Sequence, residues 1–120
     1  GQAFEVFGDG TQRRDFTYVD DAVEAFLLAA ASERAAGRVY NLGGDPLSLR
    51  ELAERLVHVA GRGEYRMVPF PPERKAIDIG DYFADSSLIR EELGWRPRVL
   101  PDDGLRATLE FYREHGGRYW

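Results

Sequence analysis

Arg14 is the residue of this chain whose type and setting most clearly suggest chemistry. It lies in the run GDGTQRRDF, residues 8–16, after a glycine-rich turn and directly before Asp15. A guanidinium group places two N–H donors on phosphate oxygens, and these charge-assisted hydrogen bonds are stronger than neutral ones. Arg14 is therefore a candidate phosphate ligand. The alternatives are an ion pair with Asp15 or a solvated surface charge, and we interpret Arg13 as a neighbouring surface charge.

Other titratable residues have structural explanations. His58 follows polar positions of a predicted helix and is expected to be exposed, whereas His115 near a helix end suits the helix dipole. The acidic pairs 20–21 and 102–103 stand at predicted helix starts, where carboxylates are favoured. No further ligands lie beside either pair, so we assign no metal site.

Composition bounds the class of protein. The 120 residues predict one domain, 1–120, and no apolar run approaches the roughly 18 residues that cross a bilayer. A net charge of −5 argues against nucleic acid as a partner, because phosphate neutralisation needs a basic face. The absence of cysteine and of a targeting pattern gives weak support for a cytoplasmic location, and we expect no membrane partner.

Strands alternate with helices along the chain, which predicts an α/β fold. The predicted strands are short and lie at 4–7, 12–19, 38–42 and 64–68. Four helices are predicted from apolar spacing and end signals, at about 20–32, 48–60, 86–93 and 101–115. A capping box of Ser48 and Glu51 marks the second helix, and Gly61 ends it. The proline-led segment 69–81 is predicted to be a loop without regular structure.

The first predicted helix is apolar nearly all round, with Glu24 as its only interior charge. Such a helix should be buried against something larger. Since the chain also begins abruptly in a strand, we expect an N-terminal partner segment to be missing.

Three sequence blocks, in order, resemble extended short-chain dehydrogenases/reductases of the NAD-dependent epimerase/dehydratase family. They are GDGTQRRDFTYVDD at 8–21, YNLGG at 40–44 before a serine-initiated helix, and YFADSS at 82–87 before a helix ending in LGW. The match covers essentially the whole chain and is strongest to the sugar-nucleotide group, which includes UDP-glucose 4-epimerase, an isomerase. It implies a small C-terminal substrate-binding lobe, with the Rossmann half absent.

The resemblance also implies roles for particular residues. Arg14 would contact the substrate diphosphate, and an Arg-x-x-Asp pattern maps onto Lys75 and Asp78, with Arg74 one residue earlier. Which of the two cations reaches phosphate stays open, because lysine lacks the guanidinium fork. Asp78 would accept a ribose hydroxyl, unless this loop is simply solvated.

The opening strand would lie beside the nucleotide base. Phe4, Val6 and Phe7 are candidates for that contact, although core packing is the preferred explanation for any single one of them. Gln12 is a candidate assistant at the phosphate region.

The family's catalytic parts are not found in the sequence. The Gly8-Asp9-Gly10 run is no dinucleotide fingerprint, and Lys75, the only lysine, does not follow a tyrosine by four positions. We therefore assign no catalytic and no cofactor-binding residue to this chain, and we expect it to be inactive alone. NAD would be bound by the missing half, the N-terminal Rossmann half of the same protein.

The predicted ligand is a nucleoside-diphosphate sugar, UDP- or dTDP-linked. Epimerisation, dehydration and decarboxylation stay open as the reaction of the parent protein. The rival hypothesis is a stand-alone binding or self-assembly module without catalytic activity. The apolar first helix argues against an isolated module and makes a homo-oligomer possible.

Overall fold

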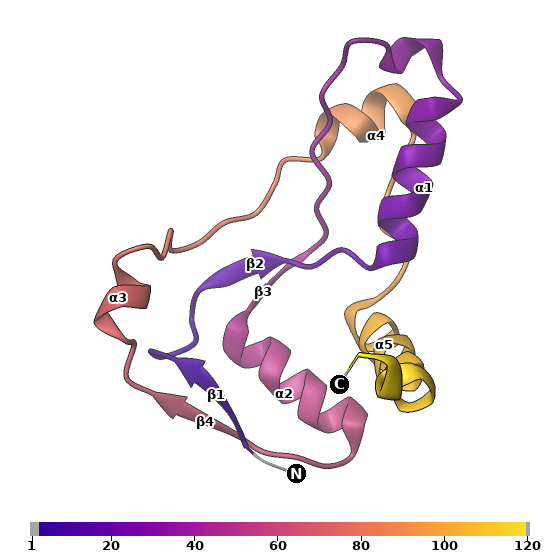
Figure 1. Cartoon of the computed structure of the whole chain (residues 1–120). Helices are drawn as coiled ribbons and strands as arrows, with labels where there is room; N and C mark the ends of the chain where they lie inside the picture. The colour runs from indigo at the N-terminus through magenta and orange to yellow at the C-terminus, as the bar shows by residue number, and fades with distance from the viewer. Residues whose placement is uncertain (1–2, 120) are drawn as a thin grey trace.

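The computed structural model describes residues 3–119 and shows short strands alternating with helices (Figure 1). In chain order the elements are β1 (Phe4–Phe7), β2 (Arg13–Asp15), α1 (Val19–Ala30), β3 (Pro46–Ser48), α2 (Leu49–Ala60), β4 (Tyr65–Val68), α3 (Pro72–Lys75), α4 (Ser87–Leu93) and α5 (Pro101–His115). Single 3-10 turns follow α1 and α5, at Glu33–Ala35 and Gly116–Arg118. None of the helices within residues 3–119 is long and apolar enough to span a bilayer.

Two small sheets organise the lower part of the molecule in Figure 1. β1 pairs in parallel with β4, so that Val6 faces Met67 across the ladder. β2 pairs antiparallel with β3, and Arg14 also forms an isolated parallel bridge with Tyr82. The second sheet therefore brings β2 to the loop that precedes α4.

α2 connects β3 to β4 and covers the β1–β4 pair. Its start is a complete capping box: the Ser48 side chain accepts from the Glu51 N–H at 3.1 Å, and Glu51 accepts from the Ser48 N–H at 2.7 Å. Gly61 ends the helix in the left-handed conformation, with φ of 65°, which costs glycine little. Both ends agree with the sequence prediction.

A separate core lies between α1 and α4. Ala25, Ile89 and Trp95 are buried there, and Tyr40 and Leu42 pack against them. The Trp95 indole N–H donates to the backbone carbonyl of Asp21 at 2.8 Å, which fastens the start of α1 to the segment after α4.

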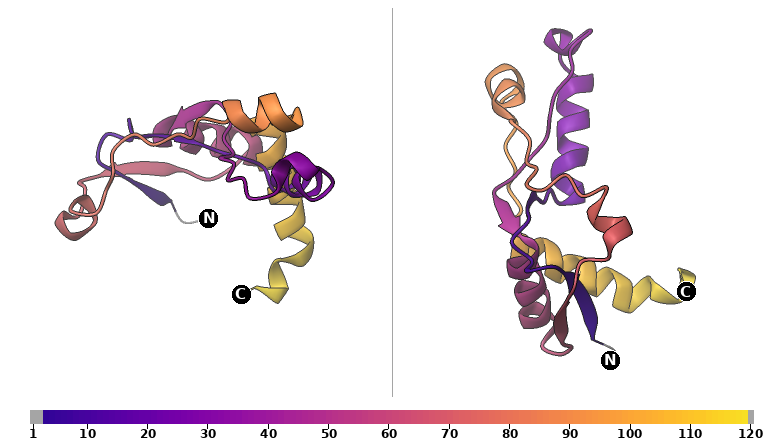
Figure 2. Two further views of the ribbon diagram at one scale, coloured as in Figure 1. Left: turned by 90° about the horizontal axis from the view of Figure 1, so that it is seen from above. Right: turned by 90° about the vertical axis from the view of Figure 1, so that its left-hand side faces the viewer.

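The overall shape is open. The radius of gyration is 16.9 Å, whereas a compact chain of this length has about 13.6 Å. The accessible surface of 8784 Å² likewise exceeds the roughly 6,600 Å² expected for this mass. α1, α3 and α5 project to one side of the molecule, away from α4 (Figure 2). On α1 the apolar side chains of Val19, Val23, Phe26 and Leu27 are exposed, Phe26 at 73%.

The sequence prediction did not include β3 at Pro46–Ser48, and further details of it are wrong. Residues 38–42 are extended but are not a strand, because Tyr40 and Leu42 turn into the Trp95 core instead of pairing with a strand. The proline-led segment contains α3, a fifth helix, since proline suits a first helical turn where no N–H is needed. Asp20 or Asp21 was expected to cap the first helix, but α1 begins after Tyr18 without a side-chain cap, and both aspartates lie within its first turn. The Asp21 carboxylate accepts from the N–H groups of Arg98 and Val99 instead.

Candidate functional site

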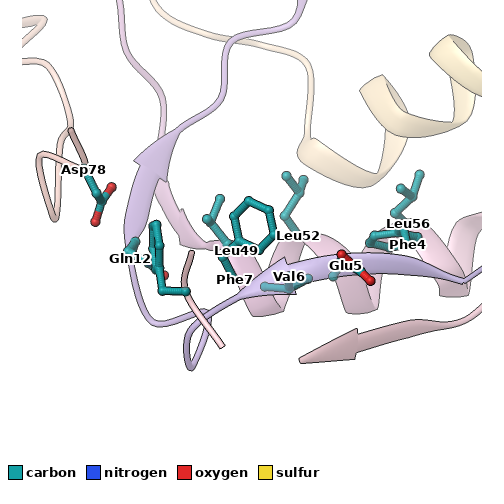
Figure 3. A pocket seen from close by; sticks show the side chains of 11 residues that line it. Phe4, Glu5, Val6, Phe7, Gln12, Leu49, Leu52, Leu56 and Asp78 are labelled. Carbon is teal, nitrogen blue, oxygen red and sulfur yellow. The ribbon is translucent and has the colours of Figure 1, made fainter. Parts of the chain in front are cut away.

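A cleft of about 260 Å³ lies between β1 and α2 (Figure 3). Its walls are largely apolar and are formed by Phe4, Val6, Phe7, Leu49, Leu52, Ala53, Leu56 and Phe70, with Glu5, Gln12 and Asp78 as the polar members. Gln12 and Asp78 stand at one end of the cleft, and Phe4 and Leu56 at the other. An apolar hollow with polar groups gathered at one end suits a ligand that has a flat apolar part and a polar part.

Aromatic rings line this cleft. The rings of Phe7 and Phe70 lie 5.7 Å apart, tilted by 48°. Phe4 also lines the cleft, and its ring lies 6.1 Å from that of Tyr65, which is not part of the lining. Val6 is buried in the β1–β4 pair, so it serves the core as well as the cleft. Phe7 is only partly buried and is the better candidate of the two for contact with a ligand.

Gln12 has an unusual environment. Its side-chain oxygen Oε1 is buried and has no hydrogen-bond partner among the described residues. A buried acceptor that lacks a donor costs about 1–3 kcal/mol. The backbone carbonyl of Gln12 is satisfied, since it accepts from the Leu49 N–H at 3.0 Å. The acceptor without a donor is therefore the side-chain oxygen of Gln12, and this side chain lines the cleft.

The turn before Gln12 is well ordered by local bonds. Asp9 Oδ1 accepts from both the hydroxyl and the N–H of Thr11, at 2.7 and 3.1 Å, and these bonds hold the pKa of the Asp9 carboxyl below its ordinary value. Gly8 and Gly10 adopt positive φ values of 70° and 68°. This turn joins one strand to another and opens no helix, so it does not fit the phosphate loop of a dinucleotide site.

Arg14 reaches Asp78 from β2. Its Nη2 donates to Asp78 Oδ1 at 3.3 Å, while Nη1 donates to the carbonyls of Arg13, at 2.8 Å, and Gly80. Both side chains of the ion pair are about three-quarters buried, with 25% and 23% exposed. The structure thus pairs Arg14 with Asp78 and not with its neighbour Asp15.

Asp15 holds the same loop from the next position of β2. Its Oδ2 accepts from the Ala84 N–H at 2.8 Å. A Cβ on Gly43 would collide with this carboxylate and lie 3.2 Å from the Ala84 carbonyl oxygen. The YNLGG block therefore needs a glycine at 43 because β2 and the loop close over it.

The structure brings together five of the seven candidate residues. Val6, Phe7, Gln12 and Asp78 line the cleft, and Arg14 is bonded to Asp78 at its polar end. Arg74 and Lys75 lie in α3, exposed, and neither lines the cleft nor forms an ion pair with a described residue. Within residues 3–119 no cluster of His, Asp and Glu is arranged to hold a metal ion.

Sequence reasoning missed part of the lining of the cleft. Phe70 lies between prolines and carried no strand or helix signal, although an isolated aromatic in a proline-rich loop was the available indication. Leu49, Leu52 and Leu56 were predicted as the apolar face of a helix, and that face lines the cleft as well as supporting β1.

Comparison with known proteins shows where this fold recurs. The model of the NAD dependent epimerase/dehydratase family matches residues 1–43. The dTDP-glucose 4,6-dehydratase of Streptomyces niveus is 40% identical over 100% of this chain and 34% of its own length. The chain is thus similar to members of the NAD-dependent epimerase/dehydratase family. The resemblance noted from the three sequence blocks is thereby confirmed.

Solved structures of this family confirm the fold. The dTDP-glucose 4,6-dehydratase of Streptomyces venezuelae, with NAD and TYD bound, superposes with a TM-score of 0.82 at 35% identity, over 100% of this chain and 36% of that one. The UDP-glucose 4-epimerase of Thermotoga maritima, with UDP-glucose, gives 0.76 at 30% identity, over 93% and 35%. The chain has the α/β fold of a C-terminal lobe and spans about a third of the length of these relatives.

Proposed function

We propose that this chain binds the nucleoside-diphosphate part of a sugar nucleotide in the cleft between β1 and α2. The observation that carries the proposal is the Arg14–Asp78 pair at the polar end of an apolar, aromatic-lined cleft. A nucleoside diphosphate has a matching order of parts: a flat base, a hydroxyl-bearing sugar and an anionic diphosphate. Relatives whose structures hold TYD or UDP-glucose support the same class of ligand.

Each candidate residue has a part in this proposal. Arg14 binds the diphosphate through its forked donors, and it is already oriented by the carbonyls of Arg13 and Gly80. Asp78 accepts a hydroxyl hydrogen bond from the sugar. Phe7 and Val6 pack on the base, with Phe70 beside Phe7.

A second cation for the diphosphate is proposed from α3. Arg74 and Lys75 are exposed on this short helix, and the Asp78 N–H donates to the Lys75 carbonyl at 3.3 Å. The backbone thus places α3 directly before the polar end of the cleft. Either cation adds positive charge there, Arg74 with a fork and Lys75 as a point charge.

For the whole protein we propose an NAD-dependent sugar-nucleotide epimerase or dehydratase. Structures of relatives hold NAD, whereas the glycine turn of this chain does not fit a dinucleotide. The residues of this chain then supply substrate binding and specificity. We assign none of them a role in hydride transfer or proton abstraction. Epimerisation, as in an isomerase, and dehydration both fit this division. A cytoplasmic location and inactivity of the chain by itself are part of the same proposal.

The exposed face of α1 is proposed to pack against the dinucleotide-binding half of the same protein. Val19, Val23, Phe26 and Leu27 form an apolar strip on an element that projects to one side of an open molecule (Figure 2). Exposed apolar surface of this kind is usually covered. The rival is self-association of this chain through the same strip. Light scattering of wild type and Phe26→Ser separates the two, because only self-association gives an oligomer that the substitution dissolves.

Titration of UDP and dTDP into the wild-type chain and an Arg14→Ala variant tests the proposed function. Arg13→Ala is the matched control, since Arg13 donates to the Pro46 carbonyl and lies over the Phe83 ring instead of reaching the cleft. We expect Arg14→Ala to weaken binding at least 10-fold and Arg13→Ala to change it little. Equal binding by all three proteins would remove Arg14 from the site.

A further inference from the structure

The three sequence blocks GDGTQRRDFTYVDD, YNLGG and YFADSS meet at the Asp15 side chain. Asp15 Oδ2 accepts from the Ala84 N–H at 2.8 Å, and a Cβ on Gly43 would collide with the same oxygen. The buried Ser86 hydroxyl donates to the Gly43 carbonyl at 3.5 Å, which ties the second block to the third. These four residues are not among those that line the cleft. The junction therefore needs an explanation other than contact with a ligand there.

The junction fixes one end of the stretch that carries Asp78. Between α3 and α4 the chain is a long connection (Figure 1), and β2 binds it at every second residue from 80 to 84. The bonded groups are, in order, the Gly80 carbonyl with the Arg14 guanidinium, the Tyr82 N–H with the Arg13 carbonyl at 3.0 Å, and the Ala84 N–H with the Asp15 carboxylate. Since β2 ends at Asp15, this carboxylate takes the place of a backbone acceptor and extends the pairing by one step.

We propose that Asp15 is a positioning residue of the candidate site: its carboxylate sets where residues 78–84 lie along β2 and so holds the Arg14–Asp78 pair in the geometry that binds diphosphate. This inference rests on the proposed function, and it gives Asp15 no contact with the ligand. Arg14 and Asp15 are neighbours on β2, and the first binds residues 78 and 80 while the second binds residue 84. Release of residue 84 would therefore let Asp78 move relative to Arg14.

A purely structural role for Asp15 predicts something different. If the carboxylate only added stability, its loss would lower the melting temperature and leave the UDP affinity of the folded protein unchanged. If it positions the ion pair, the folded protein without it binds UDP more weakly, because part of the binding free energy is then spent on ordering the loop.

Titration of UDP into Asp15→Ala and Asp15→Asn, at a temperature where each variant is folded, tests this. We expect Asp15→Ala to weaken binding about 3- to 10-fold, because the Ala84 N–H loses its acceptor. Asp15→Asn keeps an acceptor oxygen and should bind within about 2-fold of wild type. Asp21→Asn is the control for stability, since Asp21 is buried and bonded to a different segment, residues 98–99. It should lower the melting temperature without changing UDP affinity.

Gly43→Ala perturbs the same junction from the second block. Gly43 does not have a positive φ, so alanine is opposed there by the collision of its Cβ with the Asp15 carboxylate. We expect a loss of UDP affinity of the same size. Added to Asp15→Ala, the substitution should cost less than it does in wild type, because the colliding oxygen is gone. This variant decides the question if Asp15→Ala does not fold.

Amide hydrogen exchange of the wild type gives a readout that needs no variant. UDP should slow exchange of the Tyr82 and Ala84 N–H groups, which lie outside the cleft lining, because binding at the ion pair and order of the loop are coupled.

The possible outcomes separate this inference from the proposed function. Wild-type affinity in folded Asp15→Ala, with dependence on Arg14 intact, overturns the positioning role and leaves the proposed function standing. An equal loss of affinity in Asp15→Asn would assign the effect to charge, and an equal loss in Asp21→Asn would assign it to general stability; either overturns the positioning role. Exchange at Tyr82 and Ala84 that UDP leaves unchanged overturns it as well. If wild type binds no UDP, the proposed function fails, and this inference fails with it.

Discussion

Arg14 on β2 and Asp78 in the loop after α3 form an ion pair with an N···O distance of 3.3 Å. The pair joins positions 64 residues apart, and the guanidinium also donates to the Gly80 carbonyl. Arg14 is therefore held in one orientation before any ligand arrives, and its position depends on the loop. If Arg14 binds phosphate as proposed, that binding is linked to the order of residues 76–84.

Replacing Arg14 with lysine should keep the positive charge but weaken the binding of UDP. Lysine has no fork, so it cannot hold Asp78, the Gly80 carbonyl and a phosphate oxygen together. We expect UDP affinity to fall about 10-fold in Arg14→Lys, measured by titration at fixed salt. Arg13→Lys is the control and should bind as wild type does. Wild-type affinity in Arg14→Lys would mean that only the charge at this position matters.

The cations of α3 should act through long-range attraction. We expect the double variant Arg74→Ala, Lys75→Ala to bind UDP about 3- to 10-fold more weakly at low salt, with the difference shrinking as salt is added. Each single variant then shows which cation is responsible. If the double variant binds like wild type at every salt concentration, α3 has no part in the site.

Asp21 is predicted to be the most sensitive acid for stability. It is 3% exposed, and its carboxylate accepts the N–H groups of Arg98 and Val99 at 3.0 and 3.1 Å. Asp21→Asn keeps one acceptor oxygen and turns the other into a donor that faces an N–H. We expect a loss of about 1–3 kcal/mol in the free energy of unfolding, measured by urea denaturation. Asp20→Asn, at an exposed first-turn position, should change stability by less than about 0.5 kcal/mol.

The capping box should make the stability of α2 depend on acidic pH. The Ser48 N–H and hydroxyl, bonded to Glu51, hold the pKa of this carboxyl below its ordinary value of 4.5. A lowered pKa in the folded state gives stability that is complete above the unfolded-state pKa and is lost as pH falls through the folded-state pKa.

Thermal melts from pH 6 down to about pH 3 test this. Glu51→Gln should flatten the acid loss, whereas Glu91→Gln, exposed on α4, should leave it unchanged. Ser48→Ala should cost about 1 kcal/mol at neutral pH, because the cap acceptor is removed. An unchanged acid profile in Glu51→Gln would show that the box carries no pH dependence.

Helix positions were predictable where the sequence contains explicit end signals. Ser48 with Glu51, Gly61, Gly94 and Pro101 each mark a boundary that the structure keeps. The strand predicted at 38–42 failed because Tyr40 and Leu42 pack into a tertiary core, which no local pattern reports, while Val39 is exposed. The β-propensity of Tyr40 favours an extended backbone, but it does not indicate which segment residues 38–42 would pair with.

The residues of the candidate site were predictable in part. Arg14, Asp78, Val6, Phe7 and Gln12 were found from a motif and its resemblance, and the structure gathers them at one cleft. Contacts between residues far apart in the sequence could not be predicted. No local sequence pattern indicates that Arg14 pairs with Asp78 and not with Asp15. Phe70 and the unsatisfied oxygen of Gln12 likewise depend on how β1 and α2 meet.

Chemical-shift mapping of UDP on the ¹⁵N-labelled chain tests the central claim most directly. The proposed function predicts saturable shifts that concentrate on the backbone N–H groups of residues 6–14 and 76–82 and on the side-chain amide of Gln12, and that vanish in Arg14→Ala. Shifts that gather instead on α5 or on the exposed face of α1, or that persist unchanged in Arg14→Ala, would contradict it.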